Sequence, residues 1–262
     1  MIKFPDMKRV SHLIYTGIVF SLASLFADNV VYAQGKDSTA LNSGYDIRTG
    51  SFLLPQRLPS GKYSHSINIL YVVPPKDWTL DAVVAPMFNY TGKYTLPKGF
   101  NLQGGISTLI ISNRINAGPF WNYSIGKYHF GVGYQIAFNL GILRQFGYNT
   151  ILTGWESQPS LTVGYNFGKT ALTIRGDLYN TLSISLNEAG NKLSSTDSFI
   201  NGYSVTTSFE QRLHNNKKTN KVRVMSLGFK VNYLRYHIIA WPALPASQYR
   251  YIMPEFQIGW NF

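Results

Sequence analysis

The last twelve residues of the chain alternate between two kinds of side chain. One set is Ile252, Pro254, Phe256, Ile258, Trp260 and Phe262, and the other is Tyr251, Met253, Glu255, Gln257, Gly259 and Asn261. Successive side chains of a strand point to opposite sides, so a period of two predicts a two-faced β-strand. A soluble sheet also has an apolar face, but it seldom carries its largest aromatic residues to the very end of the chain.

The same period of two continues through the chain from Tyr63 onward. It is cleanest in residues 130–140, where large apolar side chains alternate with Gly131, Gly133, Gln135, Ala137 and Asn139. We expect about ten strands, with counts of eight or twelve left open. The expected strands fall within residues 63–73, 80–90, 100–110, 121–125, 130–140, 161–167, 172–184, 203–209, 227–233 and 251–262.

The composition fits strands that meet an apolar surrounding on one face and a polar interior on the other. Aromatic residues make up 15% of the 262 residues and charged residues only 14%, at a mean hydropathy of −0.08. A soluble protein normally carries more charge, and a helical membrane protein is far more apolar. The chain has no cysteine, which excludes disulfides, thiolate metal ligands and a lipidated N-terminal cysteine.

Residues 1–33 have the pattern of a secretory signal peptide. Lys3, Lys8 and Arg9 precede an apolar run over residues 13–26, and Ala33 marks a cleavage site before Gln34. A membrane anchor is the alternative, but the run is shorter than the roughly 20 apolar residues of a spanning helix. Residues 34–62 are polar and turn-rich. We interpret them as a periplasmic leader before a barrel formed by residues 63–262, and two alternatives stay open: a disordered leader, or one partly tucked into the barrel mouth.

The C-terminal strand resembles the assembly signal of Gram-negative outer-membrane β-barrel proteins. Phe262 stands as the terminal aromatic residue, with Phe256, Ile258 and Trp260 at the alternating positions before it. The resemblance implies an all-β fold, a transmembrane antiparallel up-and-down β-barrel in the cell outer membrane with both termini in the periplasm. It also implies contact with outer-membrane lipids and with the barrel-assembly machinery. It points to no subfamily, and a partner in the cell envelope stays open.

The lengths of the connections agree with this resemblance. Outer-membrane barrels have short periplasmic turns and longer outside loops. Counting back from a periplasmic C-terminus, the outside loops are residues 237–248, 186–200 and 141–157, all long. The alternate connections are tight at Gly126-Lys127 and Gly168-Lys169 and intermediate at residues 214–221. A β-sandwich gives no reason for its loops to be sorted in this way.

Charged residues at inward positions predict a filled lumen. Four neighbouring strands carry them, so opposite signs can pair across the lumen wall and avoid the cost of an unpaired buried charge. Inward glycines leave room for long side chains, and wide porins need 16 or more strands. We therefore expect a filled polar interior. The predicted lumen charge network is Arg175, Asp177, Glu210, Arg212, Lys230 and Glu255.

Basic residues account for the net charge of +12. Many fall in the connections assigned to the periplasm, where they either solvate the turns or attract anionic phospholipid headgroups. Nucleic acid is a poor partner for an exported barrel. The basic residues assigned to these turns are Lys93, Lys98, Lys127, Lys169, Lys217, Lys218 and Lys221.

Catalytic chemistry has little support in the sequence. No Gly-rich phosphate loop, paired-carboxylate motif or metal-ligand spacing is present, so no catalytic, cofactor-binding or metal residue is assigned. His65 lies between Ser64 and Ser66 at the periplasmic start of the first strand, beside no obvious acid. His237 follows Tyr236 near the outer end of a strand, where an aromatic belt explains the cluster better than catalysis.

The expected function is non-enzymatic. A small barrel with a filled polar lumen suits a structural or interaction role, or a narrow solute conduit. The alternative is a lipid-modifying outer-membrane enzyme, of lipid A deacylase or phospholipase type, with His237 at its outer rim.

Overall fold

A computed structural model describes residues 47–75, 85–109, 111–144, 149–196, 198–213, 223–237 and 249–262. The predicted signal peptide, the first part of the predicted leader and the connection at residues 214–221 lie outside these ranges. The described residues include two short 3-10 helices, η2 (Ile47–Thr49) and η3 (Pro97–Gly99). Within the described ranges, no helix has the length and apolar character needed to cross a membrane.

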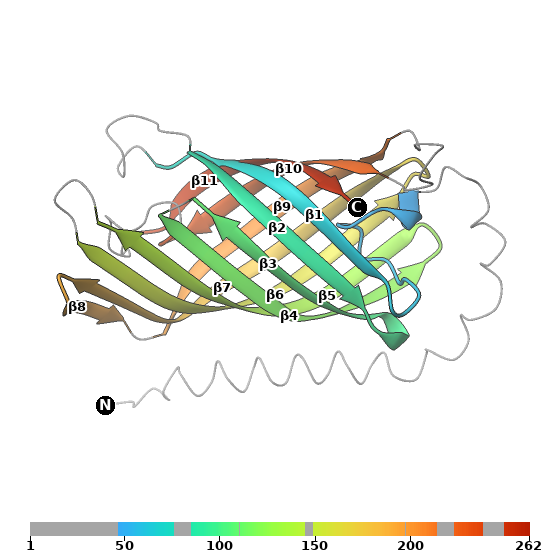
Figure 1. The fold of residues 1–262 in the computed structure, drawn as a ribbon. Helices are drawn as coiled ribbons and strands as arrows, with labels where there is room; N and C mark the ends of the chain where they lie inside the picture. The colour runs from blue at the N-terminus through green and yellow to red at the C-terminus, as the bar shows by residue number, and fades with distance from the viewer. Residues whose placement is uncertain are drawn as a thin grey trace, which may run out of the picture. The chain divides into compact units, whose positions relative to one another are not determined.

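Ten of the described strands form a closed antiparallel barrel (Figure 1). Neighbours in sequence pair around the barrel, β7 pairs with β9, and β11 returns to β1. The predicted all-β, up-and-down antiparallel barrel of about ten strands is thus confirmed. The strands are β1 (Tyr63–Val72), β2 (Ala85–Thr95), β3 (Phe100–Thr108), β4 (Ser112–Ile125), β5 (Tyr128–Leu143), β6 (Thr150–Asn166), β7 (Thr170–Glu188), β9 (Phe199–Arg212), β10 (Val224–Leu234) and β11 (Tyr251–Asn261).

The first and last strands close the barrel. β1 and β11 pair from Ser66↔Asn261 to Val72↔Glu255. Beyond that ladder the backbones of His65 and Phe262 exchange hydrogen bonds of 3.2 and 2.9 Å. Closure matters because an open sheet edge would leave a row of unpaired backbone groups, which lipid cannot satisfy.

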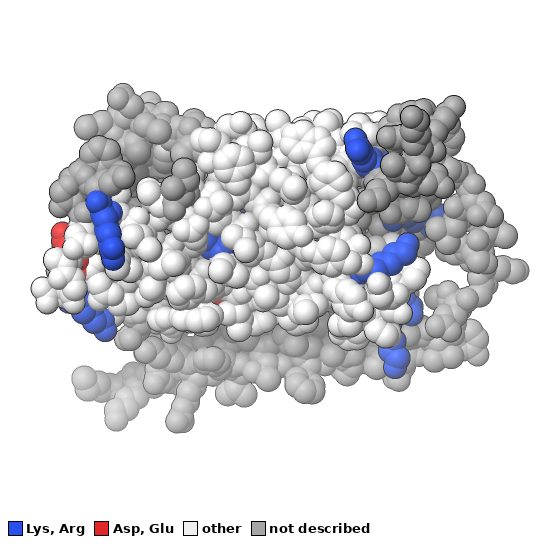
Figure 2. Space-filling model, in the orientation of Figure 1, with Lys and Arg blue, Asp and Glu red and all other residues white. Residues whose placement is uncertain are grey.

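The two faces of the wall are inverted relative to a soluble protein. On β5, Phe130, Val132 and Tyr134 point outward and are exposed, whereas the glycines between them are buried. Polar side chains make up most of the buried set of the described residues, among them asparagines, serines and threonines. Figure 2 shows one side of the molecule, with Lys and Arg mainly toward its two ends and a largely uncharged band between.

Several strands run further than their patterns predict. β6 begins at Thr150, and β7 continues to Glu188 and forms a hairpin with β8 (Asn191–Thr196). The predicted loops 141–157 and 186–200 are therefore too long, and Glu156 lies in a strand. The start of β6 was missed because Ser157 and Gln158 are buried beside Glu156 where a bulge interrupts the alternation. The tight turns were predicted correctly: Gly126 and Gly168 have φ of 56° and 99°.

Candidate functional site

A segment before the first strand occupies one mouth of the barrel. We call residues 47–57 the plug. Its first backbone N–H, that of Ile47, donates to the carbonyl of Gly168 in the β6–β7 turn at 2.7 Å. Ile47 and Leu54 form a buried apolar cluster with Ala171 and Val224 of the wall. In Figure 1, η2 lies at the end of the barrel where the chain terminates.

Glu210 of β9 holds the plug in place. Its side chain is fully buried, and a carboxylate can only accept hydrogen bonds when ionised. Donors from the plug and from β11 surround it, and such charge-assisted bonds are stronger than neutral ones. The donors are the backbone N–H groups of Phe52 (2.9 Å), Leu53 (3.2 Å) and Leu54 (3.2 Å), the Ser51 hydroxyl and the Asn261 side-chain amide (2.6 Å).

Lys93 holds the plug from the other side of the lumen. Its Nζ donates to the Phe52 carbonyl at 2.7 Å and lies 4.8 Å from the centre of the Phe52 ring. Only 1% of Lys93 is exposed, so its assignment to a periplasmic turn was wrong. The reason is strand length: β2 continues to Thr95, which carries Lys93 on the inward face of the strand.

Two wall glycines make room for the plug. A Cβ at Gly131 would come within 2.8 Å of Pro55 Cβ, and one at Gly164 would lie 3.0 Å from Pro55 Cδ and closer still to Leu54. On the same side Asn122 donates to the Gln56 carbonyl at 3.2 Å. Inward glycines were predicted to leave room for long side chains from opposite strands, and these two instead leave room for the Leu54 and Pro55 side chains of the plug.

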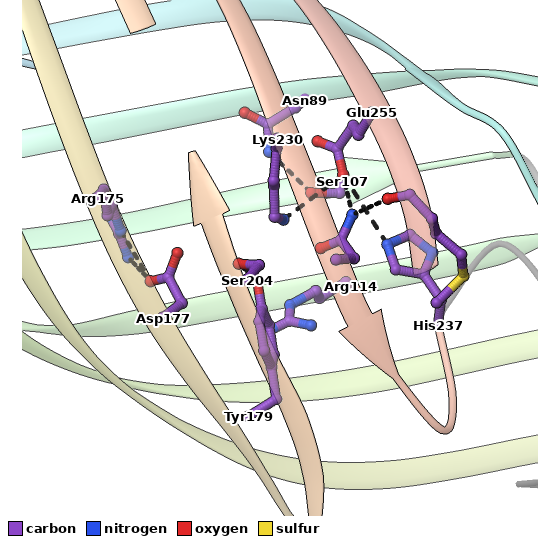
Figure 3. Close-up of polar contacts among 12 residues, drawn as sticks. Asn89, Ser107, Arg114, Arg175, Asp177, Tyr179, Ser204, Lys230, His237 and Glu255 are labelled. Carbon is purple, nitrogen blue, oxygen red and sulfur yellow. Dashed lines mark hydrogen bonds and ion pairs between the residues drawn. The ribbon is translucent and has the colours of Figure 1, made fainter. Parts of the chain in front are cut away.

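Above the plug lies a polar cavity of about 230 Å³. Phe52 to Pro55 of the plug form part of its lining, and charged side chains from the wall project into it. Figure 3 shows these side chains reaching inward from separate strands. Six of these charged side chains form three ion pairs, and the charges cancel within each pair. The pairs are Arg175–Asp177 at 2.8 Å, Arg114–Glu156 at 2.8 Å and Lys230–Glu255 at 3.5 Å.

Glutamine side chains join two of these pairs into one network. Gln158 donates to Asp177 at 2.9 Å and accepts from Arg114 at 2.8 Å. The third pair approaches it through Tyr179, because Lys230 Nζ lies 5.6 Å from the ring centre and Arg114 Cζ 5.7 Å. A hydrogen-bonded network therefore links β4, β6 and β7, and Tyr179 lies between this network and the third ion pair.

The structure divides the six residues predicted as one lumen network. Arg175–Asp177 and Lys230–Glu255 are ion pairs, whereas Glu210 binds the plug. Arg212 lies at the end of β9, where its backbone N–H donates to the Lys169 carbonyl at 3.1 Å. The sequence reasoning missed Arg114, Glu156 and Lys93. The inward position of Arg114 could have been predicted, because it directly precedes the outward Ile115. It was missed because the predicted strand began at residue 121, whereas β4 begins at Ser112.

The other mouth is narrowed by residues that follow β10. Asn201 accepts from the backbone N–H groups of Arg235 (3.0 Å) and Tyr236 (2.9 Å) and donates to the Tyr236 carbonyl at 2.9 Å. Tyr236 and His237 are consequently buried and line the cavity. Their assignment to an outward aromatic belt was wrong, because the Asn201 clamp turns the chain over the lumen.

His237 is a neutral group in this setting. Burial and the nearby positive charges of Lys230 and Arg114 lower the pKa of its imidazole to about 3. Its Nε2 lies 4.0 Å from Glu255, and the residue is 8% exposed. The imidazole therefore faces the lumen, away from a lipid substrate at the outer surface.

The other histidines lie at the plug end or outside the described residues. His65 stacks with Tyr63 at 5.8 Å and contacts the Phe262 ring at 5.3 Å. His129 Nδ1 lies 2.8 Å from Ser124 Oγ, which accepts from the backbone of Arg57 at 3.1 Å, so this pair supports the plug. His214 is not among the described residues, within which no group of three His, Asp or Glu side chains could hold a metal ion.

The residues of the predicted assembly signal share the outer surface. Phe256, Ile258, Trp260 and Phe262 are all exposed, and Phe256 contacts Phe229 of β10 at 5.1 Å between ring centres. They form a continuous apolar strip beside the closure of β1 with β11. The described fold and lumen are those of an antiparallel ten-strand barrel with an apolar exterior and a charged, plugged interior.

Comparison with known proteins relates this barrel to others by fold alone. No protein-family model and no curated protein matches the sequence. Neisserial surface protein A is 15% identical, with a TM-score of 0.36 over 76% of this chain and 94% of that one. The translocator domain of autotransporter NalP from Neisseria meningitidis is 10% identical, with a TM-score of 0.39 over 79% and 90%. Ail of Yersinia pestis, solved with the heparin analogue sucrose octasulfate, is 11% identical, with a TM-score of 0.32 over 78% and 100%. All three are outer-membrane β-barrels.

Proposed function

We propose that this protein is an integral outer-membrane barrel with a structural or interaction role and a lumen closed to diffusion. The observation that carries the proposal is the plug, fixed between Glu210 and Lys93 at one mouth. The polar cavity beyond it, of about 230 Å³, has Phe52 to Pro55 of the plug in its lining. The charged side chains around it are already paired and leave little reason to expect a continuous aqueous path.

The outward side chains support a membrane location. Large apolar groups such as Phe130, Leu161 and Phe209 face away from the lumen on strands around the barrel. Tight turns and the C-terminus share one end, which we assign to the periplasm because outer-membrane barrels have short periplasmic turns. The β7–β8 hairpin then faces the cell exterior. Its exposed turn at Gly190 and Asn191 is the surface that we propose for contact with an envelope or external partner.

A lipid-modifying enzyme is less well supported. That alternative needs His237 at the outer rim beside lipid, whereas the imidazole lines the lumen. A narrow solute conduit is the other candidate function, and it differs from a closed barrel in the ionic current that it would carry.

Conductance of the purified mature protein in planar bilayers tests the proposal. We expect no steady, porin-like current from the wild type at neutral pH. Arg175→Ala combined with Lys230→Ala removes two long lumen side chains but leaves the plug contacts intact, and should give at most a small, noisy leak. Large and stable single-channel steps from the wild type would overturn the closed-lumen proposal in favour of a solute conduit.

A further inference from the structure

Two arginines face each other at the outer end of the last two strands. The β10–β11 ladder ends at the pair Leu234↔Tyr251, and Arg235 and Arg250 are the residues directly beyond it, one after β10 and one before β11. Both are half-buried at the rim, two positions beyond Tyr233 and before the exposed Ile252. Like charges directly opposite on neighbouring strands destabilise a sheet. This position therefore favours a counter-charge.

The described residues supply no carboxylate for either guanidinium. Arg250 instead donates to the backbone carbonyls of Asn201 (3.3 Å) and Ile200 (3.2 Å), which carry no net charge. Arg235 stacks on the Phe199 ring at 5.8 Å, and its enclosed Nε has no hydrogen-bond partner. The 14 residues between the two arginines contain no Asp or Glu.

Both arginines contact Asn201 of β9, one through its backbone and the other through its side chain. The Asn201 carbonyl accepts from Arg250 Nε and also from the backbone N–H of Arg235, at 3.1 Å. Beside them Ile200, Tyr203 and Ile252 are exposed apolar or aromatic residues, with Ile252 65% exposed. Two guanidinium groups thus border a surface suited to acyl chains, at the level where a lipid headgroup begins.

We propose that Arg235 and Arg250 bind the phosphate of an anionic outer-leaflet lipid whose acyl chains lie against Ile200, Tyr203 and Ile252. Guanidinium groups form forked, charge-assisted hydrogen bonds with phosphate oxygens. A phosphate between the two arginines supplies the missing negative charge. The site names a lipid partner for the proposed outer-membrane barrel and rests on that membrane location.

The test uses the full mature chain in phosphatidylcholine vesicles with or without bisphosphorylated lipid A. We expect the lipid A to raise the thermal unfolding midpoint of the wild type. Arg235→Gln should weaken the apparent lipid affinity roughly tenfold, the loss of one charged hydrogen bond. The Arg235 side chain makes no hydrogen bond within the described protein, so the midpoint without lipid A should hardly change.

Matched arms separate this site from general charge attraction and from free phosphate. Lys192→Gln removes one exposed cation from the same end of the barrel and should keep the wild-type response. Dephosphorylated lipid A and inorganic phosphate alone should give no shift. An unchanged response of Arg235→Gln, an equal loss in Lys192→Gln, or an equal shift with inorganic phosphate would each refute the proposed site. The conductance experiment is a separate readout, so failure of one proposal is distinguishable from failure of the other.

Discussion

The role of Glu210 in the structure differs from the role predicted from the sequence. In the sequence it is one inward charge among several on neighbouring strands. In the fold its two oxygens accept from three consecutive backbone N–H groups, a hydroxyl and an amide. Backbone donors have no signature in the sequence because every residue except proline carries one. The pairing of Glu210 with the plug was therefore beyond prediction, although its burial was expected.

Glu210→Gln should loosen the plug without removing a strand residue. The glutamine amide carries an N–H₂ group where the carboxylate had an accepting oxygen, so some of the surrounding donors lose their acceptor. Each buried donor left without a partner costs about 1–3 kcal/mol of stability. We expect trypsin to cleave the folded protein faster after Arg48, whose carbonyl accepts from Gln56 at 2.6 Å within the plug. Glu188→Gln, at the far end of β7, is the control. Equal resistance to trypsin in Glu210→Gln and wild type would argue against this anchoring role.

The Lys230–Glu255 pair can be tested by a double-mutant cycle. Glu255→Ala leaves Lys230 without its carboxylate, and such losses in buried sites cost about 3–5 kcal/mol. Here the cost should be smaller, because 19% of the Lys230 side chain is exposed to the cavity. We expect a lower unfolding midpoint in detergent for Glu255→Ala, and partial recovery when Lys230→Ala is added. Strictly additive effects would mean that the two side chains do not interact.

At the scale of elements, periodicity predicts the strands and fails at their ends. β5 and β11 alternate without interruption, so their faces were assigned correctly. β6 contains a bulge, and β7 continues into a hairpin with β8. The predicted strands were therefore shorter than those in the structure. The plug has no period at all. Its position depends on contacts of Phe52 with Lys93 of β2 and Glu210 of β9, which lie 41 and 158 residues further along the chain and leave no local pattern.

Removal of Phe262 should impair assembly more than export. Phe262 extends β11 by one backbone pair with His65 and adds a ring contact at 5.3 Å beside the closure. Because the C-terminal strand resembles an assembly signal, its truncation should also weaken recognition by the barrel-assembly machinery. We expect fractionation to show less truncated protein in the outer membrane and unchanged passage across the inner membrane. Phe100→Ala, an exposed aromatic substitution away from the closure, should insert normally. Normal insertion of the truncated chain would count against the signal.

At the scale of the whole molecule, the sequence predicted an apolar exterior and a charged interior, and the structure has both. The partition follows from alternation alone, since each strand presents one face to each side. Which charges meet was harder to foresee, because it depends on strand registers and bulges. Arg114 reaches Glu156 from two strands away, which requires β4, β5 and β6 to be placed together. The outer site at Arg235 and Arg250 depends on that same knowledge of register.

The location of the plug also constrains the order in which the molecule can be completed. The plug comes from the start of the described chain, while its Glu210 anchor is completed by Asn261, the last residue of β11. A segment at the beginning of the described chain therefore depends on the last strand for its complete binding site. Contacts so distant in sequence form late, because the chain between them has to be ordered first. We therefore expect the plug to bind late in folding, because a chain that stops before β11 lacks Asn261, which completes the Glu210 anchor.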